Sequence, residues 1–127
     1  MDKIIKNLLK NRGIKTKKDV ENFFNPPLPY KLSPSKVGID ARQLKNGVTR
    51  IIQAIQNKEK IIVYGDYDVD GISATAILWE TLDFLGANAK PYIPDRFTEG
   101  YGLNVDSIKK LKEEDPELSL IVTVDHG

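Results

Sequence analysis

The fold is decided by residues 61–71, which read IIVYGDYDVDG. The stretch opens with a short apolar run, rich in β-branched residues, of the kind that forms a buried strand. It then becomes polar at once, with a Gly-Asp pair and three aspartates at alternate positions. Residues 72–85 are rich in Ala, Leu and Ile and predict a buried helix, which Gly86 would end in the left-handed conformation. The stretch therefore predicts a strand, a polar turn and a helix in direct succession.

The chain repeats this alternation toward its C-terminus. Further strands are predicted at residues 89–93 and 118–124, separated by a polar, glycine-rich loop at 95–104 and a helix at 105–114. This order predicts an α/β fold, a parallel sheet with helices on both faces. Because parallel strands end at the same edge of a sheet, the polar segments that follow them should meet there, where open α/β sheets bind ligands.

The segment before residue 61 has a different pattern. A short helix is predicted at residues 2–12, and Thr16 is expected to cap a second one. The prolines of residues 25–39 exclude a regular helix or a central strand, so we expect a connector on the surface. Asp40 is expected to cap a long amphipathic helix that leads to the first strand.

The charges are distributed unevenly along the 127 residues. Residues 1–60 carry 14 Lys and Arg against 5 Asp and Glu, whereas residues 61–127 carry 5 against 13, although the net charge is only +1. Metal-dependent nucleic-acid enzymes combine a basic surface with an acidic site in this way. The alternative is that the lysine-rich helix faces are simply solvated.

Composition excludes several classes of protein. The chain has no cysteine, which excludes disulfides, thiolate metal sites and a cysteine nucleophile. Its one histidine is His126, so any metal must be held mainly by carboxylates. No segment approaches the roughly 18 consecutive apolar residues that a membrane span requires, so no membrane partner is expected.

The aspartates at positions 66, 68 and 70 are so close in sequence that their carboxylates should repel one another. At about 5 Å and an effective dielectric constant near 20, each pair of carboxylates costs roughly 3 kcal/mol. A hard divalent cation such as Mg²⁺, Mn²⁺ or Ca²⁺ would remove that cost. The alternative is an Asp-Gly turn with solvated side chains.

Two better-known acidic loops fit less well. An EF-hand calcium loop requires a Glu at its twelfth position, where this chain has Ile77, and a helix rather than a strand before it. The aspartyl-phosphate phosphatases require Thr or Val two residues after their second Asp. Here that position is Asp70 or Ile72, depending on the alignment, so this interpretation is a poor one.

Three segments together resemble a known family. They are residues 63–71 (VYGDYDVDG), 94–103 (PDRFTEGYGL) and 122–127 (VTVDHG), and they resemble, in order, the first three motifs of the RecJ single-stranded-DNA exonucleases. These enzymes form a branch of the DHH phosphoesterase superfamily. The resemblance covers residues 40–127, and its most specific part is 94–103, because other branches of the superfamily lack that motif.

The resemblance implies roles for individual residues. Asp68 and Asp70 match family metal ligands, and Asp125 matches the carboxylate that bridges two divalent cations, Mn²⁺ or Mg²⁺. Asp66 matches an acidic position beside them that holds water or orients the site. These four aspartates are the catalytic residues that the resemblance implies, and Arg96 stands where the family contacts a substrate phosphate.

Four other residues call for an interpretation. Tyr101, in the glycine-rich loop, is a candidate to stack on a base, whereas Trp79, within an apolar helix, is expected in the core. Tyr64 stands where many superfamily members have a metal-binding histidine, so it is not expected to be a ligand. His126, beside Asp125, is expected to position the backbone or contact water.

The implied function is that of a metal-dependent phosphodiesterase that degrades single-stranded DNA in repair and recombination. The resemblance also implies a cytoplasmic enzyme, with a single-strand binding protein and a helicase as partners. A sister phosphoesterase acting on short oligonucleotides, cyclic dinucleotides or pyrophosphate is an alternative, as is a catalytically dead scaffold.

The resemblance also implies a division of the chain. Residues 1–39 would be a helical leader with a Pro-rich connector, and 40–127 the N-terminal part of a DHH-type domain. The family's Asp-His-His motif and second domain would lie beyond Gly127, so we expect an N-terminal fragment that is inactive alone.

Overall fold

The computed structural model describes residues 2–100 and 102–126 of the chain. The chain falls into two compact units, Met1–Leu44 and Lys45–Gly127. Every strand that the structure describes lies in the second unit, so the sheet belongs to that unit alone. Among the described residues, no helix has both the length and the apolar character needed to cross a membrane.

The first unit begins with two capped helices. Helix α1 (Lys3–Asn11) is capped by Asp2, whose carboxylate accepts a hydrogen bond from the backbone of the first turn. Helix α2 (Lys17–Phe24) begins with a capping box. In it the Thr16 hydroxyl accepts from the Asp19 N–H at 3.1 Å, and the Asp19 carboxylate accepts from the Thr16 N–H at 3.0 Å. Both helices confirm the prediction, because cap chemistry is local in sequence.

The Pro-rich connector forms two short 3-10 helices, η1 (Pro29–Lys31) and η2 (Pro34–Val37). Each begins at a proline, because the fixed φ of proline suits a first helical position and its missing N–H is not needed there. The described structure confirms that residues 25–39 contain no α-helix and no strand. Apart from Leu32, the residues of this connector are exposed.

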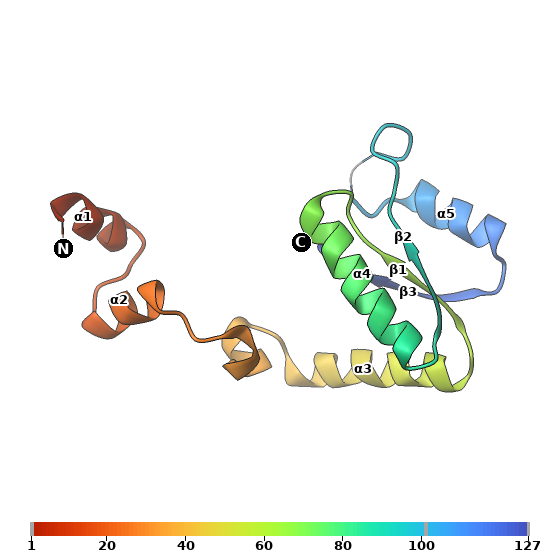
Figure 1. The fold of residues 1–127 in the computed structure, drawn as a ribbon, viewed down its shortest axis with the longest axis horizontal. Helices are drawn as coiled ribbons and strands as arrows, with labels where there is room; N and C mark the ends of the chain where they lie inside the picture. Colours follow the sequence, from red (N-terminus) through yellow and green to blue (C-terminus); the bar gives the residue numbers. More distant parts are fainter. Residues whose placement is uncertain (1, 101, 127) are drawn as a thin grey trace. The chain divides into compact units, whose positions relative to one another are not determined.

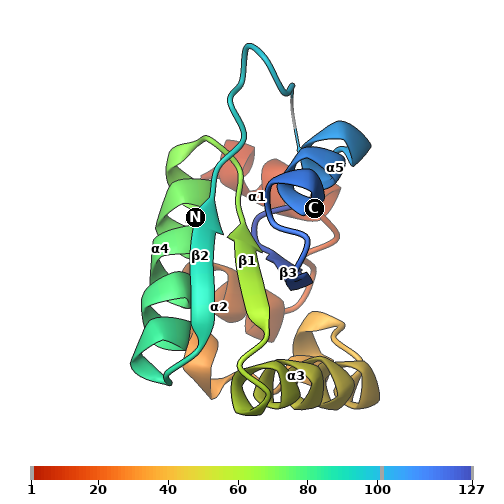
Figure 2. The ribbon, with the colours of Figure 1, turned by 90° about the vertical axis from the view of Figure 1, so that its right-hand side faces the viewer.

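The second unit is built on a parallel sheet. Strands β1 (Lys60–Tyr64), β2 (Asn88–Tyr92) and β3 (Leu118–Thr123) pair in the order β2-β1-β3 (Figure 2). Helix α4 (Val69–Phe84) connects β1 to β2, and helix α5 (Val105–Glu114) connects β2 to β3. The predicted α/β fold with a parallel sheet is thereby confirmed.

Helix α3 (Ala41–Gln56) precedes the central strand. Asp40 caps it as predicted, because its Oδ1 accepts a hydrogen bond from the Gln43 N–H at 2.8 Å. Near its C-terminal end, Ala54 is fully buried in the core of the second unit.

The side chains of β1 point alternately into two cores. Ile61 and Val63 join a cluster that α3 and α4 cover, whereas Ile62 and Tyr64 lie in a second cluster with Leu111 of α5. Helices therefore cover both faces of the sheet, and α4 and α5 lie on different sides of the strands in Figure 1. A strand buried on both faces has a continuous apolar sequence, which is why β1 was recognisable.

Helix α4 differs from the prediction in two ways. It begins at Val69 rather than at residue 72, because Asp68 caps it: Oδ1 of Asp68 accepts from the N–H groups of Asp70 at 3.1 Å and Gly71 at 2.9 Å. It is also not buried all round, since Phe84 is 89% exposed. Only one face of α4 packs on the sheet, and the opposite face is exposed.

Two other predictions on α4 are confirmed. Trp79 packs against the cluster of α3 and α4, and its indole Nε1 donates a hydrogen bond to the Ala89 carbonyl at 3.1 Å. A core position therefore explains this tryptophan. Gly86 follows the helix with φ +76°, the left-handed conformation that glycine adopts without strain.

Candidate active site

The acidic segments lie at the point where the strand order reverses. The chain runs from β1 to β2 on one side of the central strand, and β3 then returns to the other side. In open α/β sheets such a reversal leaves a crevice at the carboxyl ends of the two strands beside it, here β1 and β3. Asp66 follows β1 and Asp125 follows β3. The predicted convergence at this edge is therefore what the topology produces.

The turn after β1 is held by close backbone packing. A Cβ at Gly65 would lie 1.8 Å from the Thr75 hydroxyl, and a Cβ at Gly71 would lie 2.5 Å from the Asp66 carbonyl oxygen. The Thr75 hydroxyl in turn donates to the Gly71 carbonyl at 2.7 Å. The turn and the first turn of α4 thus touch at a spacing that only glycine allows.

Within this turn the three aspartates have different environments. Asp66 is 2% exposed, and its Oδ1 accepts the Tyr67 N–H at 2.8 Å. Asp68 and Asp70 are exposed, with Asp68 serving as the cap of α4 and Asp70 lying in its first turn. Capping gives Asp68 a structural role, but Asp70 has no such role in the described structure. A carboxylate in the first turn is favoured by the partial positive charge of a helix N-terminus.

The segment after β3 carries two unusual features. Asp125 has φ +58°, a left-handed conformation that is uncommon outside glycine and that clusters at functional sites. The ring of His126 lies 5.3 Å from the ring of Tyr64, centroid to centroid. Its Nε2 is buried and has no hydrogen-bond partner among the residues that the structure describes. Buried polar atoms without a partner are uncommon in folded proteins.

Tyr64 links the ends of the strands. Its ring lies 5.2 Å from the ring of Tyr92, its neighbour on β2, as well as against His126 after β3. Its hydroxyl donates to the Gly102 carbonyl at 3.2 Å, and the side chain is fully buried. Tyr64 therefore has a packing role at the end of the central strand.

The donor chemistry of this edge fits a divalent cation, although the described part does not complete a site. Carboxylate oxygens such as those of Asp68, Asp70 and Asp125 are the ligands that Mg²⁺ and Mn²⁺ prefer. Within residues 2–100 and 102–126, however, no group of three or more Asp, Glu or His residues lies close enough to hold a metal ion. These residues thus offer part of a donor set, and their assignment as ligands stays a prediction.

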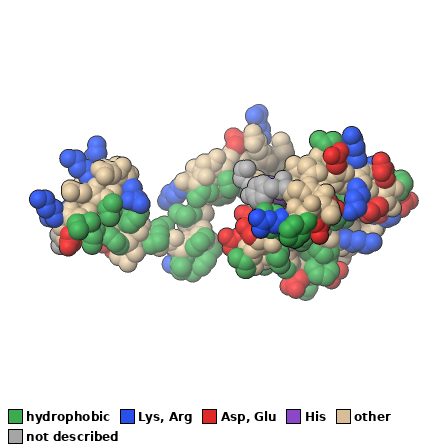
Figure 3. All heavy atoms as spheres, turned by 90° about the horizontal axis from the view of Figure 1, so that it is seen from above, with side chains coloured by type: hydrophobic (Ala, Val, Ile, Leu, Met, Phe, Trp, Pro, Cys, Tyr) green, Lys and Arg blue, Asp and Glu red, His purple; other side chains and the backbone are tan. Residues whose placement is uncertain are grey.

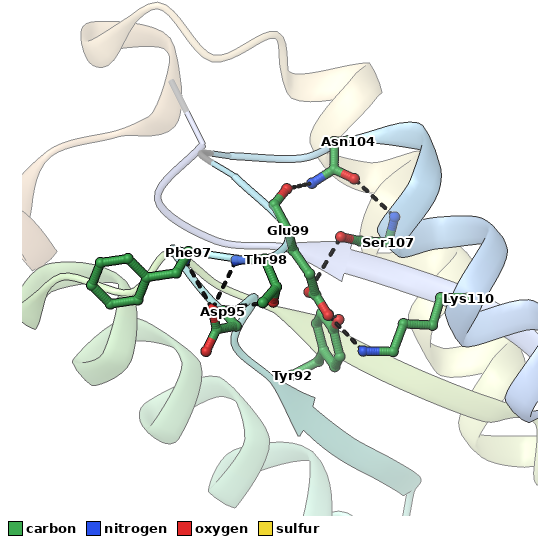
Figure 4. Close-up of polar contacts among 8 residues, drawn as sticks. All are labelled: Tyr92, Asp95, Phe97, Thr98, Glu99, Asn104, Ser107 and Lys110. Carbon is green, nitrogen blue, oxygen red and sulfur yellow. Dashed lines mark hydrogen bonds and ion pairs between the residues drawn. The ribbon is translucent and has the colours of Figure 1, made fainter.

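The loop after β2 is anchored by two carboxylates (Figure 4). Oδ1 of Asp95 accepts the N–H groups of Phe97 at 2.8 Å and Thr98 at 3.0 Å, and also the Thr98 hydroxyl at 3.1 Å. The Thr98 and Phe97 N–H groups hold the pKa of Asp95 below its ordinary value. A tight turn therefore fixes the backbone on both sides of Arg96.

Glu99 is the centre of the second anchor, which sequence reasoning missed. Its carboxylate accepts hydrogen bonds from the Lys110 ammonium at 2.6 Å, from the Ser107 hydroxyl at 3.3 Å and from the Tyr92 hydroxyl. The Asn104 side chain donates to its carbonyl at 2.9 Å. This Glu99 hub, comprising Glu99 and these four partners, ties the loop to β2 and α5. Its signal in the sequence was weak, since a carboxylate in a loop does not reveal its partners.

The Glu99 hub shifts the acidity of its members. The Lys110 ammonium, followed by the Tyr92 hydroxyl, lowers the pKa of Glu99 below its ordinary value. Burial, followed by the Glu99 carboxylate, raises the pKa of Tyr92 well above the usual range of a phenol. Glu99 is therefore a charged acceptor, and Tyr92 a neutral donor, at every physiological pH.

Arg96 reaches from this loop to the turn after β1. Its guanidinium carbon lies 5.0 Å from the centroid of the Tyr67 ring. In the part of the chain that the structure describes, the Arg96 side chain makes no ion pair and no hydrogen bond. The next residue, Phe97, is 95% exposed and was also missed, although an aromatic residue within a polar loop was its signal. Tyr101, the predicted stacking residue, lies outside the described residues.

Charge separates the two units, as the sequence indicated. Lysine side chains gather over the N-terminal helices in Figure 3, whereas both signs are mixed over the sheet-containing unit. In the first unit, Lys6, Lys10, Lys15 and Lys17 line a hollow of about 500 Å³. This hollow, which we call the lysine hollow, is also lined by Leu9, Ile14, Thr16 and Val20.

The parallel sheet and the acidic switch point define a class of protein: the chain belongs to the DHH family, whose N-terminal domain matches residues 60–127. Within that family it is similar to a particular protein, the single-stranded-DNA-specific exonuclease RecJ. It is 39% identical to the RecJ of Bacillus subtilis over 124 residues, which are 98% of this chain and 15% of the relative. It is 36% identical to that of Thermus thermophilus, with 92% of this chain and 15% of the relative covered.

Solved structures agree. The crystal structure of an exonuclease RecJ bound to manganese matches with a TM-score of 0.60 and 38% identity, over 66% of this chain and 21% of that one. RecJ from Thermus thermophilus in complex with Mn²⁺ matches with a TM-score of 0.54 and 30% identity, over 94% of this chain and 14% of that one. The resemblance and the fold class are thereby confirmed. The chain spans only 14% to 21% of the length of the proteins in these comparisons.

Proposed function

We propose that this chain is the N-terminal part of a RecJ-type enzyme, a metal-dependent phosphodiesterase that degrades single-stranded DNA from an end. The observation that carries the proposal is the match of nearly the whole chain to relatives named as single-stranded-DNA-specific exonucleases. The position of the acidic turn and of Asp125 beside the switch point of the sheet supports the proposal. Residues 1–39 and 40–127 remain our proposed division into leader and domain.

The proposed site divides its tasks among residues of the sheet edge. Asp68, Asp70 and Asp125 would hold two Mn²⁺ or Mg²⁺ ions together with ligands outside the described residues. When bound, the ions supply an activated water and stabilise the leaving oxygen. Asp66, buried at the end of β1, keeps the turn in place. Arg96 offers a forked set of donors to a phosphate oxygen.

Single-stranded DNA would be held by two further features. Exposed aromatic rings stack on bases, and Phe97 and Tyr101 are the aromatic residues of the loop after β2. Lysine-rich surfaces attract the phosphate backbone without regard to sequence, which is the role we propose for the lysine hollow. We further propose a cytoplasmic enzyme of repair and recombination, with a single-strand binding protein and a helicase as partners. The DNA substrate named for the relatives supports this.

The test uses the complete protein that carries this chain, a labelled single-stranded oligonucleotide and Mn²⁺. Asp68→Asn is the informative variant, because asparagine also caps helices but lacks the negative charge. We expect it to lower the rate on the order of 100-fold or more, with an unchanged melting temperature. Asp83→Asn, exposed at the far end of the same helix, is the matched control and should keep full activity.

Two outcomes would contradict the proposal. Normal activity in the Asp68→Asn variant would show that the Asp68 carboxylate does not hold a catalytic metal ion, which contradicts the proposed site. Cleavage confined to dinucleotides, cyclic dinucleotides or pyrophosphate, with long single strands untouched, would instead assign the protein to a sister branch of the family.

A further inference from the structure

The backbone of Arg96 is fixed by its neighbours, but its guanidinium makes no hydrogen bond to the residues that the structure describes. The Asp95 turn lies on one side of it and the Glu99 hub on the other, so the main chain is fixed. An arginine side chain nevertheless has many rotamers, which it must give up when it binds in one geometry. A group that must meet a phosphate in one geometry loses rate steeply when it is misplaced, so something has to restrict this side chain.

The restricting contact in the described structure is the ring of Tyr67. The guanidinium carbon lies 5.0 Å from the ring centroid, within the range of a cation–π interaction. The ring itself has a fixed base, because Tyr67 lies between the buried Asp66 and the helix cap Asp68, and its N–H donates to Asp66. Tyr67 is partly buried, which strengthens such a contact relative to an exposed one.

The form of this contact suits a phosphate-binding arginine. A guanidinium over a ring uses its flat face, whereas its five N–H donors lie in its plane and stay available. Pairing with an aspartate of the adjacent turn would occupy both the donors and a proposed metal ligand. In the described residues Arg96 pairs with none of those aspartates. The ring thus places the positive charge beside the acidic turn and keeps both groups free for their partners.

We propose that Tyr67 is a positioning residue for Arg96: its ring holds the guanidinium at the edge of the acidic turn, ready to receive a substrate phosphate. The proposal rests on the proposed function and adds to it a residue that the sequence analysis did not assign to the site. The positioning role requires the aromatic ring of Tyr67 and not its hydroxyl group.

The test is a double-mutant cycle in the complete protein, with kcat and KM measured on a single-stranded oligonucleotide. Tyr67→Leu should lower kcat about 5- to 30-fold, the rate equivalent of one cation–π contact, with a smaller change in KM. Tyr67→Phe keeps the ring and should retain activity within about 2-fold. In an Arg96→Ala background, Tyr67→Leu should change kcat by less than about 2-fold, because the residue it positions is gone.

Each contrary result identifies a different error. An equal effect of Tyr67→Leu with and without Arg96 would show that the ring acts on its own, for instance by stacking on a base. A loss in Tyr67→Phe as large as in Tyr67→Leu would show that the hydroxyl is what matters. Either result overturns the positioning role. Tyr67→Met, another flexible apolar side chain, replaces Tyr67→Leu if that variant melts early. Wild-type activity in Arg96→Ala would refute the phosphate role in the proposed function itself.

Discussion

At the scale of single residues, the acidic turn depends on two glycines, Gly65 and Gly71, because a larger side chain would not fit at either position. Gly71 touches the Asp66 backbone so closely that no Cβ fits between them. Sequence patterns reveal a glycine, but not the atoms that approach it, because those come from the packing of β1 against α4. Local chemistry is easier to predict, and the Thr16 and Asp40 caps were predicted correctly for that reason.

Gly71→Ala should therefore destabilise the chain. The new methyl group would lie 2.5 Å from the Asp66 carbonyl oxygen, so the turn or the helix must shift. We expect a loss of about 1–3 kcal/mol in the free energy of unfolding, measured by urea denaturation. Gly47→Ala is the control, since its Cβ in α3 would meet nothing within 4 Å. It should stabilise the helix by about 0.5–1 kcal/mol, and equal effects of the two changes would contradict this account.

At the scale of elements, the sequence predicted the strands and helices well and the loops poorly. Strands β1 and β3 were recognisable because each is largely a short apolar run, whereas β2 contains Asn, Lys and Pro and was predicted one residue late. Helix α5 was predicted with the bounds that the structure shows, Val105–Glu114. The start of α4 was missed because Asp68 looked like a member of a loop rather than a cap. The Glu99 hub was missed because its members come from β2, the loop and α5, which only the fold brings together.

The Glu99 hub should make the stability of the chain depend on acid. A carboxyl whose pKa is lower in the folded than in the unfolded state stabilises the fold above its unfolded pKa. That stabilisation is lost as the pH falls through the folded value. Glu99 is such a group, with an ordinary value of 4.5. Glu99→Gln should cost about 1–3 kcal/mol near neutral pH, and the difference from wild type should shrink below pH 4.5.

Urea denaturation at neutral pH and well below the ordinary glutamate value tests this prediction. Glu113→Gln, on the exposed face of α5, serves as the control and should follow the wild type at both pH values. Parallel acid profiles for Glu99→Gln and the wild type would show that the hub does not hold the loop.

At the scale of the whole molecule, the uneven charge predicts how binding responds to salt. Each lysine that contacts a phosphate of single-stranded DNA contributes about 0.7 to the slope of log affinity against log salt. Alanine at Lys6 or Lys10 of the lysine hollow should reduce that slope by up to this amount and leave kcat unchanged. Binding titrations of the complete protein at several salt concentrations measure the slope. Lys109→Ala, on α5, is the control, and an identical slope for all variants would exclude the hollow from the DNA path.

At the scale of the whole molecule we can also ask whether these 127 residues cleave DNA alone. The described part contains no group of three or more metal-binding side chains, and the chain spans 15% of the RecJ relatives from Bacillus and Thermus. We therefore expect no cleavage of single-stranded DNA by the isolated chain at saturating Mn²⁺, because two ions cannot both be fixed. Metal-dependent cleavage that Asp70→Ala abolishes would contradict this. The assignment of Asp68, Asp70 and Asp125 as ligands stays a prediction, since the spacing of aspartates along a chain does not fix the distances between their oxygens.

The ring of Tyr64 contacts residues of two segments that are remote from each other in sequence. It contacts Tyr92 and Gly102 on one side of the central strand and His126 on the other. Neither the loop after β2 nor the segment after β3 can swing outward without breaking contact with that ring. Local opening in native proteins proceeds by such contiguous groups, so the backbone amides of both segments should exchange with solvent deuterium through one shared opening. The segments at the carboxyl edge of the sheet would then open together, and the contacts of Tyr64 would set the rate of that opening.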